Sequence, residues 1–486
     1  MAADQAWRRV AAVPRWPELT LAAAVLAVVL LAALVPMPLL VLVIGTAVVS
    51  VLVRRPFLLT AALVVLMGSV KVNYYFGFFT LFPEYIVLAT AIGLGFFVWL
   101  GQPRWPVERE LALLFGAWIL AGLLSAPFAM SVSKVLARVM LMGMALATLF
   151  TVLYTVDTRR RLWRAVALWE VVVTLYAAFG IVQMVGIATG FDTTLHALEG
   201  ISNPDIYLGV GAPVRRRIGD VFRANSMFND PNILAGFIAA AMVAMLALRL
   251  HHAETGRRGR ARAELIALCI LGVGLFLTQS RSGALALLAG AAVVFAHRRR
   301  SLARPGVWVA VAAAIVAIGG AAVLIGVDPT LLLTRFAGIG DTTDGSNRQH
   351  LEVFIYGLQL LARFPLTGVG LGNFGLYYGS ERDAWFANMM SHSAPLSAFA
   401  ESGLPGGIAF VALWGWIVSR VARARAAPAD AAGEALRVAM LASLVALLVA
   451  NLFYDYLMRT FVWVIVGLAI ATVRLITPGR EERSAM

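Results

Sequence analysis

The sequence contains a single cysteine, Cys269, which excludes an intramolecular disulfide and a metal site built from several cysteines. Charge is also scarce, because only 14% of the 486 residues are charged whereas 61% are hydrophobic. The mean hydropathy is +0.84. A single soluble core cannot bury this much apolar surface. The composition therefore predicts a polytopic membrane protein with an all-α fold.

Motifs for metals and nucleotides are missing too. The sequence has no HxxxH or HExxH motif, and its predicted outer segments hold no paired carboxylates at metal-ligand spacing. Walker-type and dinucleotide-binding glycine motifs are absent as well, and the glycine-rich stretch 368–375 is predicted to form a turn. We therefore expect neither a catalytic metal nor a cofactor.

Long apolar windows predict about fourteen transmembrane helices. The windows lie near residues 17–35, 37–53, 57–70, 84–100, 110–126, 135–155, 164–187, 231–249, 264–279, 283–297, 306–326, 394–418, 437–453 and 459–474. The first window follows an N-terminal stretch that has no small-residue cleavage signal. We therefore expect a retained span and not a removed signal peptide.

Basic residues predict the orientation of these spans. If the N-terminus is cytoplasmic, about two thirds of the 40 basic residues lie on inner flanks, and most outer connections carry one basic residue or none. This alternation predicts that both termini are cytoplasmic. The formal net charge of +14 is then explained mostly by basic residues on the cytoplasmic flanks of the spans. Nucleic acid is therefore not an expected partner.

Two long outer segments, 188–230 and 327–393, are exceptions to this pattern of short connections. They divide the chain into an N-terminal transmembrane bundle (1–187), central helices (231–326) and C-terminal helices (394–486). Long outer loops in a protein of tight turns are where function tends to reside.

Each long segment carries a distinct pattern. The first contains Arg215, Arg216, Arg217 and Arg223, which break the inside bias, and it ends in an Asp230-Pro231-Asn232 turn that starts the next span. In the second, apolar residues at 351, 354, 355, 358 and 361 follow helical spacing. They predict an amphipathic helix along the membrane surface.

Arg281 stands out because it interrupts an apolar run. The windows 264–279 and 283–297 predict a hairpin whose outward tip is Ser-Arg-Ser-Gly. Each arm of about 15 residues spans about 22 Å, which is less than the ~30 Å hydrocarbon layer. The tip is therefore expected to be recessed, with Arg281 facing a cavity filled by water or an anion. The alternative is an arginine that snorkels to a lipid phosphate.

Other polar residues at the outer face also have structural alternatives. His392 stands just outside the next span and fits either a functional or a hydrogen-bonded structural histidine. Glu401 lies two to three turns inside that span and fits a packed helix carboxylate. The arginine triplet 215–217 fits a solvated or phosphate-facing surface.

Four stretches together resemble the O-antigen ligase and polymerase superfamily. They are FRANSMFNDPNILAG (222–236), TQSRSGALALLAG (278–290), NR (347–348) followed by FPLTGVGLGNFG (364–375), and HSAPLSAFAESGLPGG (392–407). Two positions depart from the common pattern, because the family often has Asn where this chain has Asp230 and Ser393. These departures leave the subfamily open.

The resemblance implies a metal-independent, inverting glycosyltransferase at the periplasmic face of the bacterial inner membrane. Its implied donor is a glycan linked through diphosphate to undecaprenol, and its acceptor is a lipid A core or another lipid-linked glycan. By motif, Arg223 and Arg281 bind the diphosphate, His392 acts on the acceptor hydroxyl, and Arg348 assists at the diphosphate. The further candidates for substrate binding are Arg215, Arg216, Arg217, Asn232, Ser282 and Glu401.

Elementary chemistry agrees with these implied roles. Fixed guanidinium groups stabilise the negative charge that develops on a leaving diphosphate, and an imidazole accepts or orients a proton near neutral pH. By analogy, fourteen spans and long outer loops slightly favour a polymerase over a compact ligase. The alternative is a transporter of an anionic solute or a lipid-linked glycan, for which internal repeats are expected and none is found in the sequence.

Overall fold

The computed structural model describes residues 55–67, 107–189, 223–302, 345–382 and 389–477, apart from positions 227 and 229. It also describes the short pieces 72–75, 80–81, 87–89, 91–93 and 206–208 and the single positions 316, 319, 320, 323 and 330. The predicted windows at 17–35 and 37–53 and the triplet Arg215, Arg216 and Arg217 lie outside these residues.

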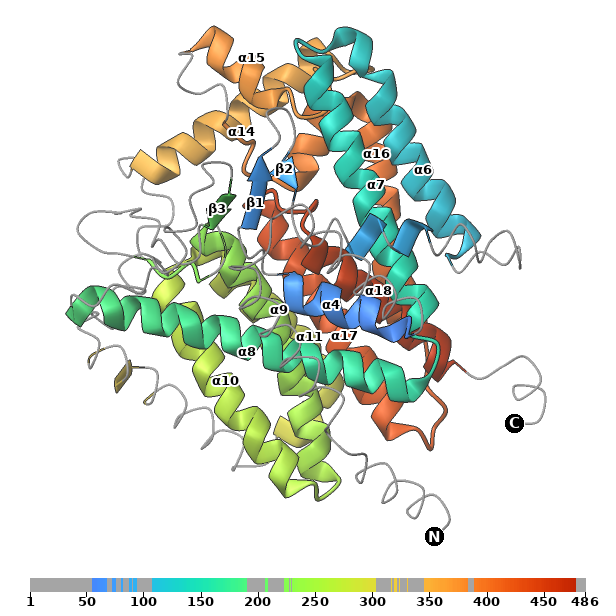
Figure 1. Ribbon diagram of the computed structural model, residues 1–486, viewed down its shortest axis with the longest axis vertical. Coiled ribbons are helices and arrows are strands. Elements are labelled where there is room, and N and C mark those ends of the chain that lie inside the picture. Colours follow the sequence, from blue (N-terminus) through green and yellow to red (C-terminus); the bar gives the residue numbers. More distant parts are fainter. Residues whose placement is uncertain are drawn as a thin grey trace, which may run out of the picture.

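Helices dominate the described residues (Figure 1). They are α4 (Phe57–Leu66), α6 (Arg109–Leu124), α7 (Val132–Thr155), α8 (Arg159–Thr189), α9 (Pro231–Glu254), α10 (Arg258–Thr278), α11 (Arg281–Leu302), α14 (Gly345–Arg363), α15 (Phe374–Glu381), α16 (Ala394–Arg423), α17 (Ala431–Leu452) and α18 (Thr460–Ile476), with a short 3-10 turn, η1 (Ala126–Phe128).

Seven of the described helices are long and apolar enough to cross a membrane. They are α6 with η1, α7, α8, α9, α10, α16 and α17, and the shorter helices α4 and α18 are apolar as well. The polytopic membrane protein predicted from composition is thus confirmed. The count of fourteen spans and the cytoplasmic termini remain predictions.

The described strands add one small antiparallel sheet, with the order β2-β1-β3. Its strands are β1 (Val72–Tyr75), β2 (Thr80–Leu81) and β3 (Ile206–Leu208). Tyr74 pairs with Leu81 on one side and with Ile206 on the other, so the sheet joins the N-terminal part of the chain to the first long segment. Strands of two to four residues leave no periodicity in a sequence, and this sheet was not predicted.

The core of the bundle is formed by α9 and α18, which are buried nearly all round. Such helices carry apolar residues on every face instead of one stripe. Close packing of α11 on α9 depends on Gly283, because a Cβ there would lie 2.5 Å from the Cβ of Ala235. Small residues allow helix axes in a membrane to approach closely. This contact fixes the start of α11 beside the start of α9.

The predicted hairpin is present as α10 and α11, but its arms are longer than the apolar windows. The helices have 21 and 22 residues, or about 32 Å each. The additional turns lie at the ends away from the tip, where they carry basic residues such as Arg258 and Arg299. The helical arms are therefore longer than predicted, since hydropathy windows end where the charged helix turns begin. The recessed tip stays a prediction.

Candidate active site

The tip of the α10–α11 hairpin is tied to the residues before α9. Arg223 donates from Nε to the Thr278 carbonyl at 2.7 Å and from Nη2 to Oδ1 of Asn232 at 2.9 Å. The same Oδ1 accepts a hydrogen bond from Ser280 at 2.8 Å. Arg223 is buried. Its guanidinium is thereby held in one orientation directly beside the hairpin tip.

The predicted turn before α9 is confirmed. Asp230 is the N-cap of α9, its Oδ1 accepts from the Asn232 backbone N–H at 2.8 Å, and Pro231 occupies the first turn. A carboxylate N-cap and an early proline both favour the start of a helix. The cap aligns Asn232, whose side chain bridges Arg223 and Ser280.

Three non-glycine residues in the described structure have positive φ angles, and each lies in one of the sequence motifs. They are Ser226 (φ 52°), Gln279 (φ 51°) and His392 (φ 54°). This left-handed conformation costs on the order of 1–2 kcal/mol for a residue with a Cβ, and such residues cluster at functional sites. Ser226 is held there by Gln183 of α8, whose Oε1 accepts from its backbone N–H at 2.8 Å.

Arg281 begins α11 and differs from Arg223 in its surroundings. It is partly buried, and among the described residues it has no hydrogen-bond or ion-pair partner. The N-terminus of a helix and a guanidinium both favour a negative group. Arg223 thus shapes the tip, whereas Arg281 leaves its donors available to a ligand.

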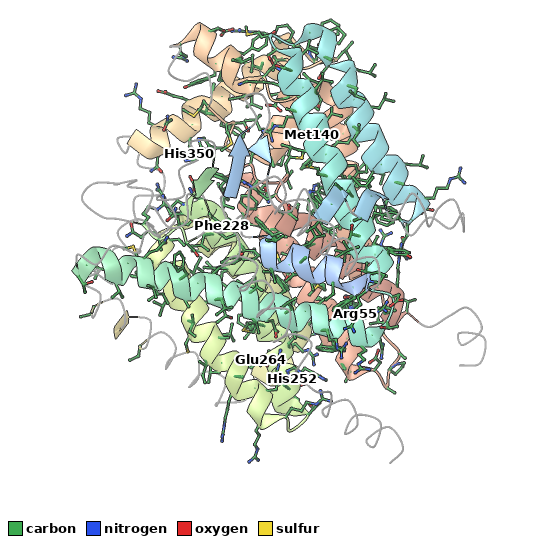
Figure 2. The ribbon with its side chains drawn as sticks, viewed as in Figure 1. Arg55, Met140, Phe228, His252, Glu264 and His350 are labelled. Carbon is green, nitrogen blue, oxygen red and sulfur yellow. The ribbon has the colours of Figure 1, made fainter. Side chains whose placement is uncertain are left out.

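His392 lies in a group of aromatic rings just before α16. Its ring centroid is 4.4 Å from that of His350 of α14 and 5.6 Å from that of Tyr454. Figure 2 shows His350 on α14, in the same half of the view as the strands. Desolvation lowers the pKa of His350, the charge of Arg281 lowers it further, and Asp230 partly opposes this. These interactions bring Arg281, His350 and His392 into one neighbourhood.

A hydroxyl and carboxylate network supports the backbone around His392. Ser391 donates to the Ser393 carbonyl at 2.9 Å, and its Oγ lies 2.6 Å from Oγ of Ser397. Ser397 in turn donates to Oδ2 of Asp455 at 2.9 Å. The two serines that flank His392 in sequence are therefore linked to one carboxylate, which helps to hold the left-handed turn.

Glu401 holds the glycine-rich stretch after α14. Its carboxylate accepts from the backbone N–H of Gly372 at 2.8 Å and of Phe374 at 3.4 Å. Gly368 and Gly372 have φ angles of 64° and 73°, so the stretch is the predicted turn. The structural alternative for Glu401, a packed and hydrogen-bonded carboxylate, matches these contacts.

Two further predicted site residues, Arg348 and Ser282, differ in their exposure to solvent. Arg348 is exposed on α14 and pairs with Glu352 at 2.9 Å. Ser282 is part of the tip, with its Oγ 3.0 Å from that of Ser280.

His350 was missed by sequence reasoning. It follows Arg348 by two residues, or about 200° around a helix, so the predicted helix already placed the two residues on different faces.

With this geometry described, the chain can be compared with known proteins. Residues 266–411 match the O-antigen ligase family. The match confirms the resemblance to the O-antigen ligase and polymerase superfamily and supports a glycan-transferring membrane enzyme in general. The O-antigen ligase segment includes Arg281, His350 and His392, whereas Arg223 and Asp455 lie outside it. A search of curated proteins finds no match to the chain.

Proposed function

We propose that the protein is a metal-independent, inverting glycosyltransferase that moves a glycan from undecaprenyl diphosphate to an acceptor hydroxyl. We place the reaction at the periplasmic face of the bacterial inner membrane, with both termini in the cytoplasm. The observation that carries the proposal is the placement of the candidate site residues around the hairpin tip. Hydrogen bonds join Arg223 and Ser280 through Asn232. The charge of Arg281 acts on His350, whose ring centroid lies 4.4 Å from that of His392.

The two arginines act on the donor in this proposal. Arg281 binds the diphosphate, and Arg223 keeps the hairpin tip in position and adds positive charge beside it. Preorganised cations stabilise the charge that develops on a leaving group without reorganisation during the reaction. Among the described residues, no group of three or more His, Cys, Asp or Glu is placed to hold a metal ion. Guanidinium groups take the metal's electrostatic role.

His392 acts on the acceptor. Its imidazole accepts the proton of the acceptor hydroxyl while that oxygen forms a bond to the anomeric carbon of the donor sugar. The bond from the anomeric carbon to the diphosphate oxygen breaks, and its electron pair leaves with undecaprenyl diphosphate. Attack opposite to the leaving group inverts the anomeric configuration. General-base catalysis of this kind contributes roughly 10²- to 10⁴-fold to a rate.

The lipid part of the donor lies beside α14 in this proposal. Leu351, Phe354, Ile355 and Leu358 form a stripe on α14 that is 44–48% exposed. The opposite side of the helix buries Val353, Tyr356 and Leu360 in a separate cluster. An exposed apolar stripe on a helix suits the boundary between lipid headgroups and acyl chains. His350 on the same helix then stands at the lipid entrance to the site.

Reconstitution tests the reaction itself. The purified protein in lipid nanodiscs, given an undecaprenyl-diphosphate-linked oligosaccharide and rough lipopolysaccharide or a second donor molecule, is expected to form a longer glycolipid and free undecaprenyl diphosphate. EDTA is expected to leave the rate unchanged. Transfer that stops with EDTA and returns with divalent ions contradicts the metal-free mechanism. Movement of the glycolipid across the bilayer without a new bond supports the transporter.

Deletion of the gene separates ligase from polymerase. Loss of all long glycan from lipid A core, seen on a glycolipid gel, indicates a ligase, whereas lipid A core capped with a single repeat indicates a polymerase. An intact gel profile with loss of secreted polysaccharide indicates an exopolysaccharide polymerase. We favour a polymerase, because the long outer segments exceed the needs of a compact ligase.

A further inference from the structure

A cavity of about 180 Å³ lies next to His392. Its lining residues do not include the arginines proposed to act on the diphosphate, Arg223 and Arg281. The polar residues that line it are Lys134 and Arg138 of α7, Ser391 before α16, Ser397 and Glu401 of α16, and Asp455 before α18. Ser391 is the chain neighbour of His392. Asp455 is the chain neighbour of Tyr454, whose ring centroid is 5.6 Å from that of His392. His392 is therefore connected to the wall of the cavity through its chain neighbour Ser391.

The charges in the cavity are balanced. Lys134 and Arg138 supply two positive groups, and Glu401 and Asp455 supply two negative groups. An anionic ligand is repelled by the carboxylates and a cationic ligand by the ammonium and guanidinium groups. A neutral molecule with many hydroxyls suits both, since a hydroxyl donates to carboxylate oxygens and accepts from Lys and Arg.

These groups retain capacity for a ligand. Arg138 and Asp455 are separated by 3.7 Å, which is longer than a direct hydrogen bond. Among the described residues, Lys134 has no hydrogen-bond or ion-pair partner, and it is partly exposed. The cavity wall thus presents one loosely paired guanidinium and one ammonium group that has no acceptor among the residues that the structure describes.

The geometry points to this cavity as the acceptor subsite, which holds one neutral sugar residue of the acceptor glycan with a hydroxyl directed at His392. This assignment rests on the proposed function. The cavity is smaller than the roughly 300–1,000 Å³ of sites for larger ligands, so it accepts a single ring and leaves the rest of the glycan outside. The Asp455–Ser397–Ser391 network joins the wall of this subsite to the backbone that carries His392.

Kinetics of Lys134→Met test the assignment. The variant is assayed in nanodiscs with the undecaprenyl-diphosphate-linked oligosaccharide and with whichever of rough lipopolysaccharide or a second donor molecule the wild type uses. We expect the KM for the acceptor to rise at least tenfold while the KM for the donor stays within twofold. Arg160→Met removes one exposed charge from α8 and is the matched control, with both constants unchanged. An unchanged acceptor KM in folded Lys134→Met overturns the assignment.

Cysteine labelling tests the subsite without turnover. Because Cys269 is the only native cysteine, Lys134→Cys in a Cys269→Ala background carries one thiol in the cavity. Oligosaccharide freed of lipid from lipopolysaccharide, or from the donor, is expected to slow its reaction with a small thiosulfonate at least fivefold. Absence of protection by both saturating oligosaccharides overturns the subsite. A wild type that transfers no glycan contradicts the proposed function instead, and labelling then still decides whether the cavity binds sugar.

Discussion

Two groups of histidines lie at opposite ends of α9. The near end is the start of the helix at Asp230, and the far end is its last turn, which contains His252. At the far end, His252 shares hydrogen bonds of 2.8 and 3.1 Å with the carboxylate of Glu264. Arg260 bonds to the same carboxylate at 3.1 Å and also pairs with Glu170. At the near end, His350 and His392 face each other beside Arg281. Residue 252 follows Asp230 by 22 positions, or about 33 Å of helix, and Figure 2 shows His252 and Glu264 far from His350.

The difference between the two groups lies in how the charges are paired. His252, Glu264 and Glu170 are buried within regular helices and are paired with one another or with Arg260, as buried ionic groups normally are. At the near end, Arg281 has no hydrogen-bond or ion-pair partner within the described part of the chain, and its charge acts on His350. The neighbouring imidazole, His392, belongs to a left-handed residue. A cluster of paired charges holds helices together, whereas the near-end cluster carries the positive charge of Arg281, which suits an anion.

Replacement of His392 should have the largest effect on activity. His392→Ala is expected to lower the rate of transfer about 10²- to 10⁴-fold, because the group that takes the proton is removed. Donor binding, measured with labelled lipid-linked oligosaccharide, should persist. His297→Ala is the matched control, since His297 is exposed on α11 away from the tip. Normal turnover by His392→Ala removes its acceptor role.

Arg281→Lys should have the next largest effect. The charge is kept but the planar pair of donors is lost, so we expect transfer to fall about 10²-fold and donor affinity to fall with it. Arg363→Lys, an exposed residue of α14 paired with Glu381, serves as the control. Full activity of Arg281→Lys excludes planar recognition of the diphosphate.

His350 should have a smaller effect that depends on pH. Its pKa lies below the ordinary 6.5, so on acidification the unfolded chain takes up protons first. The stability associated with this group is present above about pH 6.5 and is lost as the pH falls through the lowered pKa. Melting curves of wild type and His350→Gln between pH 7.5 and 5 should show a smaller acid-induced loss in the variant. Identical pH profiles contradict the desolvation of this imidazole.

Glu264→Gln should change activity least. The loss of a hydrogen-bonded carboxylate between His252 and Arg260 costs on the order of 1–3 kcal/mol. We expect a lower melting temperature but transfer per folded molecule within twofold of wild type. A loss of transfer as large as that of His392→Ala would show that the two ends are functionally coupled.

Sequence reasoning predicted the elements better than their contacts. The apolar windows at 135–155, 231–249 and 437–453 correspond to α7, α9 and α17, because a buried helix is apolar all along its length. The helix at 345–363 followed from its spacing. The motif order also indicated a resemblance to the O-antigen ligase family, and the match at residues 266–411 confirms that resemblance.

The contacts of the site depended on tertiary packing. His350 beside His392, and Asp455 linked through Ser397 to Ser391, join residues distant in sequence, and no single-chain pattern encodes such pairs. The length of α10 and α11 was underestimated because helix continues into the basic turns beyond the apolar windows. Spacing alone also gave no sign that Arg223 is held by Thr278, whereas Arg281 has no such partner among the residues described.

The three left-handed residues restrict how this site can vary in evolution. Glycine adopts such angles without strain, and asparagine tolerates them, whereas β-branched residues do not. Exchange at Ser226 and Gln279 should therefore be confined largely to glycine, asparagine and small polar residues, even though neither position needs to touch a substrate. At His392 the backbone conformation favours glycine, whereas the proposed proton transfer requires an imidazole. A histidine retained at this position in related sequences would therefore indicate selection for glycan transfer.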